Sequence, residues 1–144
     1  LLGALPRSTY TGLEVSEYLA KRFGWDHGPI TTYKSAKPFD LVVCYDVLQY
    51  LDDDEATRAI ANLAKLCRGV LYFSALTTED WHDNCDQSRT DPDVHLRIGD
   101  WYRERLTRHF TQAGAGMWIK RGAPLVVWEM EKSTVATRAR VKKG

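Results

Sequence analysis

Three side chains with polar atoms directly follow an unbroken apolar run near the middle of the chain. Leu41 to Val43 form the run, and Cys44, Tyr45 and Asp46 come next. Such a run is typical of a strand covered on both faces, and in open α/β sheets ligands bind just outside the carboxyl ends of the strands. Asp46 could remove a proton from an oxygen or nitrogen nucleophile there, but a carboxylate at its ordinary pKa is a modest base, and capping of the next turn suits it equally well. Cys44 fits a small buried apolar residue better than a nucleophile.

A second group of reactive side chains lies in a long polar stretch, residues 77–99, and at the start of the segment after it. Loops of this length inside compact domains are usually functional or disordered. His95 could act as a general base at neutral pH, and Arg97 could hold an anionic acceptor through two hydrogen bonds. A structural role remains open for both. Trp81 and Tyr102 are either walls of a substrate site or part of the core.

Two acidic clusters raise the question of a metal site. Residues 52–55 are all acidic, but Ala56, Ile60 and Leu63 follow at helical spacing, so the cluster is better explained as a helix N-terminus. Residues 82–86 include a histidine, a cysteine and two aspartates, at a spacing that matches no standard zinc site. No metal site is predicted.

The elements that must position these residues alternate between strand and helix. The patterns predict a truncated helix over residues 1–6, strands over 10–15, 30–33, 39–44, 70–73, 117–120 and 124–130, and helices over 17–23, 56–67 and 101–113. This order indicates an α/β, Rossmann-like fold: a mostly parallel sheet with helices on both faces and an antiparallel C-terminal edge pair.

The composition indicates one ordinary globular domain. The chain has 144 residues, and we expect residues 1–131 to form the domain and residues 132–144 a basic, flexible tail. The net charge is +1; without the four basic residues between 138 and 143, the 20 basic residues fall to 16 against 19 acidic ones, which disfavours nucleic acid as a partner. Three scattered cysteines favour a cytoplasmic location, and no apolar stretch is long enough to span a membrane. A homo-oligomer is left open.

Three segments together resemble a known family. They are YTGLEVSEYLAKRF (residues 10–23), FDLVVCYDVLQYLDDDEATRAIANLAKLCRGVLYFS (residues 39–74) and MWIKRGAPLVVWEME (residues 117–131). In this order they resemble the class I S-adenosylmethionine-dependent methyltransferases of the small-molecule type. The resemblance covers nearly the whole chain, and residues 39–74 are its most specific part.

The resemblance implies a cofactor and a set of site residues. S-adenosylmethionine would bind with its ribose hydroxyls on Glu14, beside Val15, and with its methionine end at Cys44, Tyr45, Asp46 and Val47. Methyl transfer depends mainly on the positioning of donor and acceptor. Asp46 and His95 would be the catalytic candidates, and a small-molecule acceptor would contact Trp81, Arg97 and Tyr102.

One departure from the family pattern keeps a second function open. The glycine-rich loop and the first strand of the family, which lies between the strands carrying Glu14 and Asp46, are not recognisable in this sequence. The alternative is therefore a non-catalytic, methyltransferase-like binding module, or a fragment that needs a partner to complete its cofactor site. A nicotinamide-dependent enzyme fits the Asp46 turn and the reversed final strands less well.

Overall fold

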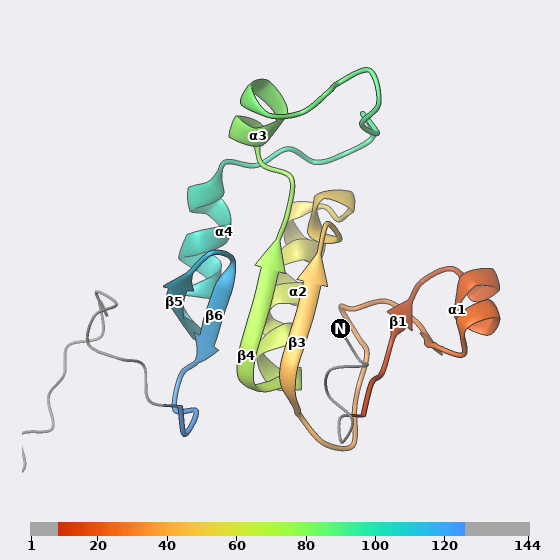
Figure 1. Cartoon of the computed structure of the whole chain (residues 1–144), viewed down its shortest axis with the longest axis vertical. Coiled ribbons are helices and arrows are strands. Elements are labelled where there is room, and N and C mark those ends of the chain that lie inside the picture. Colours follow the sequence, from red (N-terminus) through yellow and green to blue (C-terminus); the bar gives the residue numbers. More distant parts are fainter. Residues whose placement is uncertain (1–8, 126–144) are drawn as a thin grey trace, which may run out of the picture.

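The computed structural model describes residues 9–125, and Figure 1 shows the arrangement of their helices and strands. In chain order the elements are β1 (Leu13–Glu14), α1 (Glu17–Phe23), β2 (Asp26–His27), β3 (Phe39–Tyr45), the 3₁₀ turn η2 (Leu48–Tyr50), α2 (Asp53–Leu66), β4 (Cys67–Ser74), α3 (Thr78–Asp83), α4 (Gly99–Leu106), β5 (Phe110–Gly114) and β6 (Met117–Lys120). The predicted helix over residues 1–6 and the predicted tail lie outside the described residues.

The strands form two separate sheets. The larger has the order β3-β4-β6-β5; β3 and β4 are parallel, and β6 is antiparallel to both of its neighbours. The smaller consists of β1 and β2, which are parallel. The predicted fold class, an α/β Rossmann-like sheet with an antiparallel C-terminal edge pair, is confirmed.

Local signals explain where the first helices begin and end. The Ser16 hydroxyl accepts a hydrogen bond from the Leu19 N–H (3.4 Å), and Gly24 ends α1 with φ +67°. At α2, Asp52 and Glu55 form a reciprocal capping box, with Oδ1 of Asp52 2.8 Å from the Glu55 N–H nitrogen. The acidic run is thus a helix cap, as predicted, and the described residues contain no cluster of acidic, histidine and cysteine side chains that could hold a metal.

The core lies between one face of the larger sheet and helices α2 and α4. The following side chains form it: Cys44, Leu48, Ala56, Ala59, Ile60, Leu63, Ala64, Cys67, Leu71, Phe73, Tyr102, Leu106, Phe110 and Trp118. Burial of these apolar surfaces is the main stabilising contribution to the fold.

The opposite face of β3 is exposed, and the prediction that this strand is covered on both faces is wrong. Leu41, Val43 and Tyr45 alternate with core-facing residues and are 44%, 59% and 59% exposed. Figure 1 shows α2 behind β3 and β4, so that helix covers only the face on which Cys44 lies. We call the exposed side chains of Leu41, Val43 and Tyr45 the front face of β3.

The predicted helix over residues 101–113 is too long. Helix α4 ends at Leu106, and Phe110 begins strand β5. A spacing of four residues puts Tyr102 and Leu106 on one helix face, and Phe110 reaches the same core from a strand. The turn of the hairpin is Gly114 to Gly116, where all three residues have positive φ.

Three further segments differ from the expectation or lie partly outside the described residues. Residues 30–33 form a turn closed by hydrogen bonds to the Pro29 carbonyl, instead of a strand. The stretch 77–99 contains the short helix α3. The predicted strand 124–130 lies mostly outside the described residues, and β6, its predicted partner, already pairs with β4 and β5. No helix among residues 9–125 is long and apolar enough to cross a membrane.

Candidate functional site

Two described residues other than glycine have a positive φ: Ala115 in the hairpin turn, and Asp46 at the carboxyl end of β3. The φ of Asp46 is +52°, a conformation that residues other than glycine seldom adopt. The Asp46 N–H donates to the Ser74 carbonyl (3.0 Å), and the Ser74 hydroxyl lies 3.5 Å from Asp46 Oδ1. Because parallel β3 and β4 end at the same edge, with Tyr45 opposite Ser74, this contact joins the ends of the two strands. Backbone strain of this kind concentrates at functional sites.

The two residues before Asp46 point to opposite sides of the sheet. The Tyr45 ring lies on the front face, 6.3 Å from the Tyr72 ring and nearly parallel to it at 7°. The Cys44 side chain is 4% exposed, and burial together with the charge of Asp46 raises the pKa of its thiol to about 12. Cys44 can therefore face a ligand only through its backbone. Val47, which follows, is 40% exposed.

Glu14 ends β1, which lies in Figure 1 on the side of β3 away from β4, and the arrows of β1 and β3 point to the same side of the molecule. Its Oε1 accepts a hydrogen bond from the Ser16 N–H (2.9 Å), and among the described residues Oε2 has no hydrogen-bond partner. The carboxylate therefore has accepting capacity left for a ligand. Val15, next to it, is 67% exposed, and its carbonyl is 3.0 Å from His27 Nε2.

Arg97 is buried, and its side-chain N–H groups donate hydrogen bonds to other residues of this chain. The side chain is 4% exposed; Nε donates to Asp53 (2.7 Å), Nη2 to the Leu51 carbonyl (2.5 Å), and Nη1 to the Leu48 carbonyl (3.1 Å) and the Tyr102 hydroxyl (3.2 Å). Burial opposes the charge, but the hydrogen bonds to Asp53 and Tyr102 outweigh it and raise the pKa of Arg97. These contacts tie the end of the long loop to η2 and to the start of α2.

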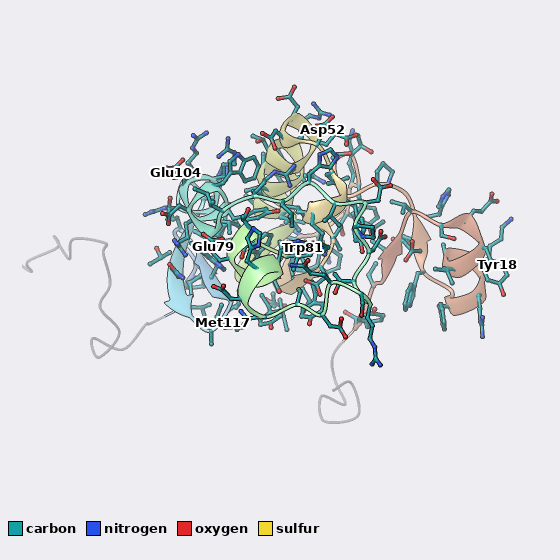
Figure 2. The ribbon with its side chains drawn as sticks, turned by 90° about the horizontal axis from the view of Figure 1, so that it is seen from above. Tyr18, Asp52, Glu79, Trp81, Glu104 and Met117 are labelled. Carbon is teal, nitrogen blue, oxygen red and sulfur yellow. The ribbon has the colours of Figure 1, made fainter. Side chains whose placement is uncertain are left out.

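The other two candidates from the long loop lie above the carboxyl edge. The His95 N–H donates to the Gln49 carbonyl (2.7 Å), and the His95 side chain is exposed. Figure 2, which looks down on this edge, shows Trp81 on α3 over the sheet. Below the loop, Gln49 is 4% exposed, and its Oε1 is buried without a hydrogen-bond partner among the described residues. The structure thus brings Asp46, Tyr45 and Val47 together, and holds His95 and Trp81 on the neighbouring loop.

A cavity of about 230 Å³ opens beside the carboxyl end of β4. Its lining residues come from β4 and the following turn, from α4 and from the β5–β6 hairpin: Phe73, Ser74, Ala75, Thr77, Gly99, Tyr102, Arg103, Leu106, Gln112, Gly116 and Trp118. Tyr102 is the one sequence candidate among them. Sequence analysis missed Gln112 because residues 110–113 were placed in a helix, although the Gly-Ala-Gly turn was a signal for the hairpin. Ser74 and Trp118 were placed next to and within predicted strands but were not singled out as site residues.

The described glycines do not form a cradle for a cofactor. A Cβ added at Gly12 would lie 2.5 Å from the Trp25 ring, and one at Gly69 would lie 2.3 Å from the Asp40 carbonyl oxygen. Both glycines are thus required by packing within the chain. Glu14 and the Tyr45–Val47 turn suit the nucleoside and sulfonium parts of S-adenosylmethionine, whereas residues 9–125 supply no glycine loop for its amino-acid end.

This chain is similar to solved structures of an N-methyltransferase, whereas no family model and no curated protein matches it. N-methyltransferase NodS from Bradyrhizobium japonicum WM9, in complex with S-adenosyl-L-homocysteine, aligns with a TM-score of 0.55 and 20% identity over 76% of this chain and 65% of that chain. A second structure of the same enzyme aligns with a TM-score of 0.56 and 19% identity over 76% of this chain and 72% of that chain. At this identity the likeness shows the fold alone, which this chain shares with that N-methyltransferase. The match to the first structure spans just under two thirds of that protein's length.

Proposed function

We propose that this chain belongs to an S-adenosylmethionine-dependent methyltransferase that acts on a small-molecule acceptor. The observation that carries the proposal is the strained Asp46, pinned to Ser74 at the carboxyl end of β3 within this fold. The solved neighbour that is bound to S-adenosyl-L-homocysteine supports the choice of cofactor. When bound, S-adenosylmethionine supplies a methyl group on a positively charged sulfur.

The residues on the cofactor side have complementary chemistry. Glu14 has one carboxylate oxygen without a hydrogen bond to any of residues 9–125, which can accept from the ribose hydroxyls, and Val15 lies beside it. The exposed Tyr45 ring offers its π face to a positive charge. Cys44 contributes through its carbonyl, and Val47 adds apolar contact.

On the acceptor side, Asp46 is assigned to hold the acceptor's O–H or N–H group and to receive its proton. It is the carboxylate at the junction of β3 and β4, and its Oδ2 makes no hydrogen bond to a described residue. His95 and Trp81 are assigned to the loop that covers this edge and excludes water. Arg97 acts as a positioning residue, because it fixes that loop through the carbonyls of η2.

A specific observation favours a second candidate, a methyltransferase-like module whose cofactor site needs another polypeptide segment. β1 and β3 belong to separate sheets, and each has an edge without a hydrogen-bonded neighbour among residues 9–125. The front face of β3 is exposed beside that edge. Parallel strands are normally buried inside a larger sheet. A strand seated between β1 and β3 would pair with both and join the two sheets into one.

Calorimetric titration of S-adenosylmethionine and S-adenosylhomocysteine into the 144-residue chain tests the proposal. We expect micromolar binding that is lost in Glu14→Ala and retained in Glu17→Ala, a control whose exposed carboxylate pairs with Lys21 on α1. Binding that is equal in both variants contradicts the assignment of Glu14. Absence of binding to a chain with a native circular-dichroism spectrum favours the module that needs completion.

A further inference from the structure

The cavity beside β4 is next to the Asp46 carboxylate but separate from the cofactor-side residues. Phe73, Ser74 and Ala75 line it, and the hydroxyl of Ser74 lies 3.5 Å from Asp46 Oδ1. None of Glu14, Tyr45 or the other cofactor-side residues lines it. A molecule in this cavity would therefore approach Asp46 from the β4 side, while Tyr45 and Glu14 remain free for a second molecule.

The inner wall of the cavity is apolar and mainly aromatic. Phe73, Tyr102, Leu106 and Trp118 line it and are 8%, 3%, 1% and 4% exposed. The Phe73 and Tyr102 rings pack 5.5 Å apart with their planes at 51°. Aromatic walls of this kind favour a flat ring, which gains stacking and edge-to-face contacts in addition to buried area.

The rim of the cavity is polar, and the charge that it carries is positive. No carboxylate lines it, and its one charged residue is Arg103, whose guanidinium contacts Asp100 Oδ1 (2.5 Å) and is 51% exposed. The hydroxyls of Ser74 and Thr77 and the amide of Gln112 complete the rim. A cationic ligand would find no counter-charge in the lining, whereas a carboxylate could share Arg103 with Asp100.

We propose that this cavity binds the methyl acceptor and that the acceptor is a small aromatic molecule, neutral or anionic, with its hydroxyl or amino group toward Ser74 and Asp46. The proposal rests on the proposed function. The volume of about 230 Å³ is below the roughly 300–1,000 Å³ of pockets for drug-sized ligands, so a single ring with short substituents fits best.

Binding of three probes of the same ring size tests the charge preference without any methyl donor. Phenol, 4-hydroxybenzoate and tyramine are neutral, anionic and cationic at pH 7. We titrate each into the 144-residue chain and follow the indole N–H signal of Trp118 by NMR, assigned with Trp118→Phe. Fragments of this size bind with dissociation constants of about 1 mM. We expect 4-hydroxybenzoate to bind two- to five-fold more tightly than phenol, and tyramine most weakly.

Arg103→Gln provides the matched variant, and Arg108→Gln, an exposed arginine outside the cavity, is its control. We expect Arg103→Gln to equalise 4-hydroxybenzoate and phenol, and Arg108→Gln to leave their ratio unchanged. Tyramine binding as tightly as 4-hydroxybenzoate, or no probe shifting the Trp118 signal, overturns the proposal. Calorimetry of S-adenosylmethionine reports on the proposed function separately. Cofactor binding without probe binding contradicts only the cavity assignment. Probe binding without cofactor binding contradicts the methyltransferase, and with it the identity of the ligand as a methyl acceptor, but leaves the cavity as a binding site for small aromatic molecules.

Discussion

Replacing Arg97 by methionine should destabilise the fold far more than replacing any exposed arginine. Methionine has a similar length and keeps the apolar contacts of the stem, but it donates no hydrogen bonds. The change leaves the carbonyls of Leu48 and Leu51 without their Arg97 donors, which lie 3.1 Å and 2.5 Å away. The Tyr102 hydroxyl, 3.2 Å from Nη1, also loses a partner.

The size of the effect follows from which partners are buried. Each buried acceptor left without a donor costs about 1–3 kcal/mol. The Leu51 carbonyl and the Tyr102 hydroxyl lose their one partner among the described residues, whereas the Leu48 carbonyl keeps the Leu51 N–H (3.3 Å), so we expect a loss of about 2–6 kcal/mol. The ion pair adds little, because the Asp53 side chain is 71% exposed and water screens it. A domain of this kind has a total free energy of unfolding of about 5–15 kcal/mol, so the loss is a large fraction of it.

Urea unfolding followed by tryptophan fluorescence measures the change. Arg105→Met is the matched control, because the Arg105 guanidinium also packs on the Trp101 ring. It lies 3.6 Å from the ring centroid, compared with 4.7 Å for Arg97, but Arg105 is only half-buried. We expect Arg105→Met to cost about 1 kcal/mol. Arg97→Lys should recover little, because an ammonium cannot reach the same acceptors as the planar fork. Equal losses of unfolding free energy in Arg97→Met and Arg105→Met would refute the argument that the buried hydrogen bonds of Arg97 stabilise the fold.

Four further predictions follow from buried groups. Phe110→Ala should lower the free energy of unfolding by about 3–5 kcal/mol in urea titrations, because this ring is 0% exposed. At pH 8.5, iodoacetamide should alkylate the half-buried Cys85 and spare Cys44, whose thiol pKa is raised to about 12; mass spectrometry of the peptides distinguishes the two, and rapid alkylation of Cys44 would contradict the burial argument. Burial and nearby positive charges lower the pKa of His109 below its ordinary 6.5, so its contribution to stability is complete above pH 6.5 and is lost as the pH falls below that value; His109→Gln should flatten this part of the stability–pH curve. Gln49→Met should leave the unfolding free energy unchanged or higher, since it removes a buried acceptor that has no partner within residues 9–125; a loss above about 1 kcal/mol would mean that a donor does reach it.

Short-range signals predicted where α1 begins and ends and where α2 is capped. Ser16, Gly24 and the Asp52–Glu55 box act on atoms within a few residues, so their types and order were enough. Phe110 was misplaced because its spacing from Leu106 suits a helix equally well, and the choice of a strand depends on pairing with Lys120, ten positions away. The local mark of that pairing is the Gly114–Gly116 turn, and glycines at this position are equally typical of a helix C-terminus.

The site was predictable where a strand simply ends, and unpredictable where distant segments meet. The position of Asp46 followed from the apolar run before it. The role of Arg97 did not, because its acceptors are separated from it by 44 to 49 positions. The exposure of Val43 could not be anticipated either, since an apolar strand reads the same whether one face or both faces are covered.

The front face of β3 should govern how the isolated chain behaves at high concentration. Long apolar edge strands recruit other chains unless charges or prolines guard them, and here Pro38 and the exposed Asp40 stand only at the start of β3. From Leu41 to Tyr45 the edge carries no charged residue. The isolated chain should therefore bind hydrophobic dyes and aggregate slowly through intermolecular β-pairing, and a lysine at position 43 would act as a gatekeeper that keeps it dispersed.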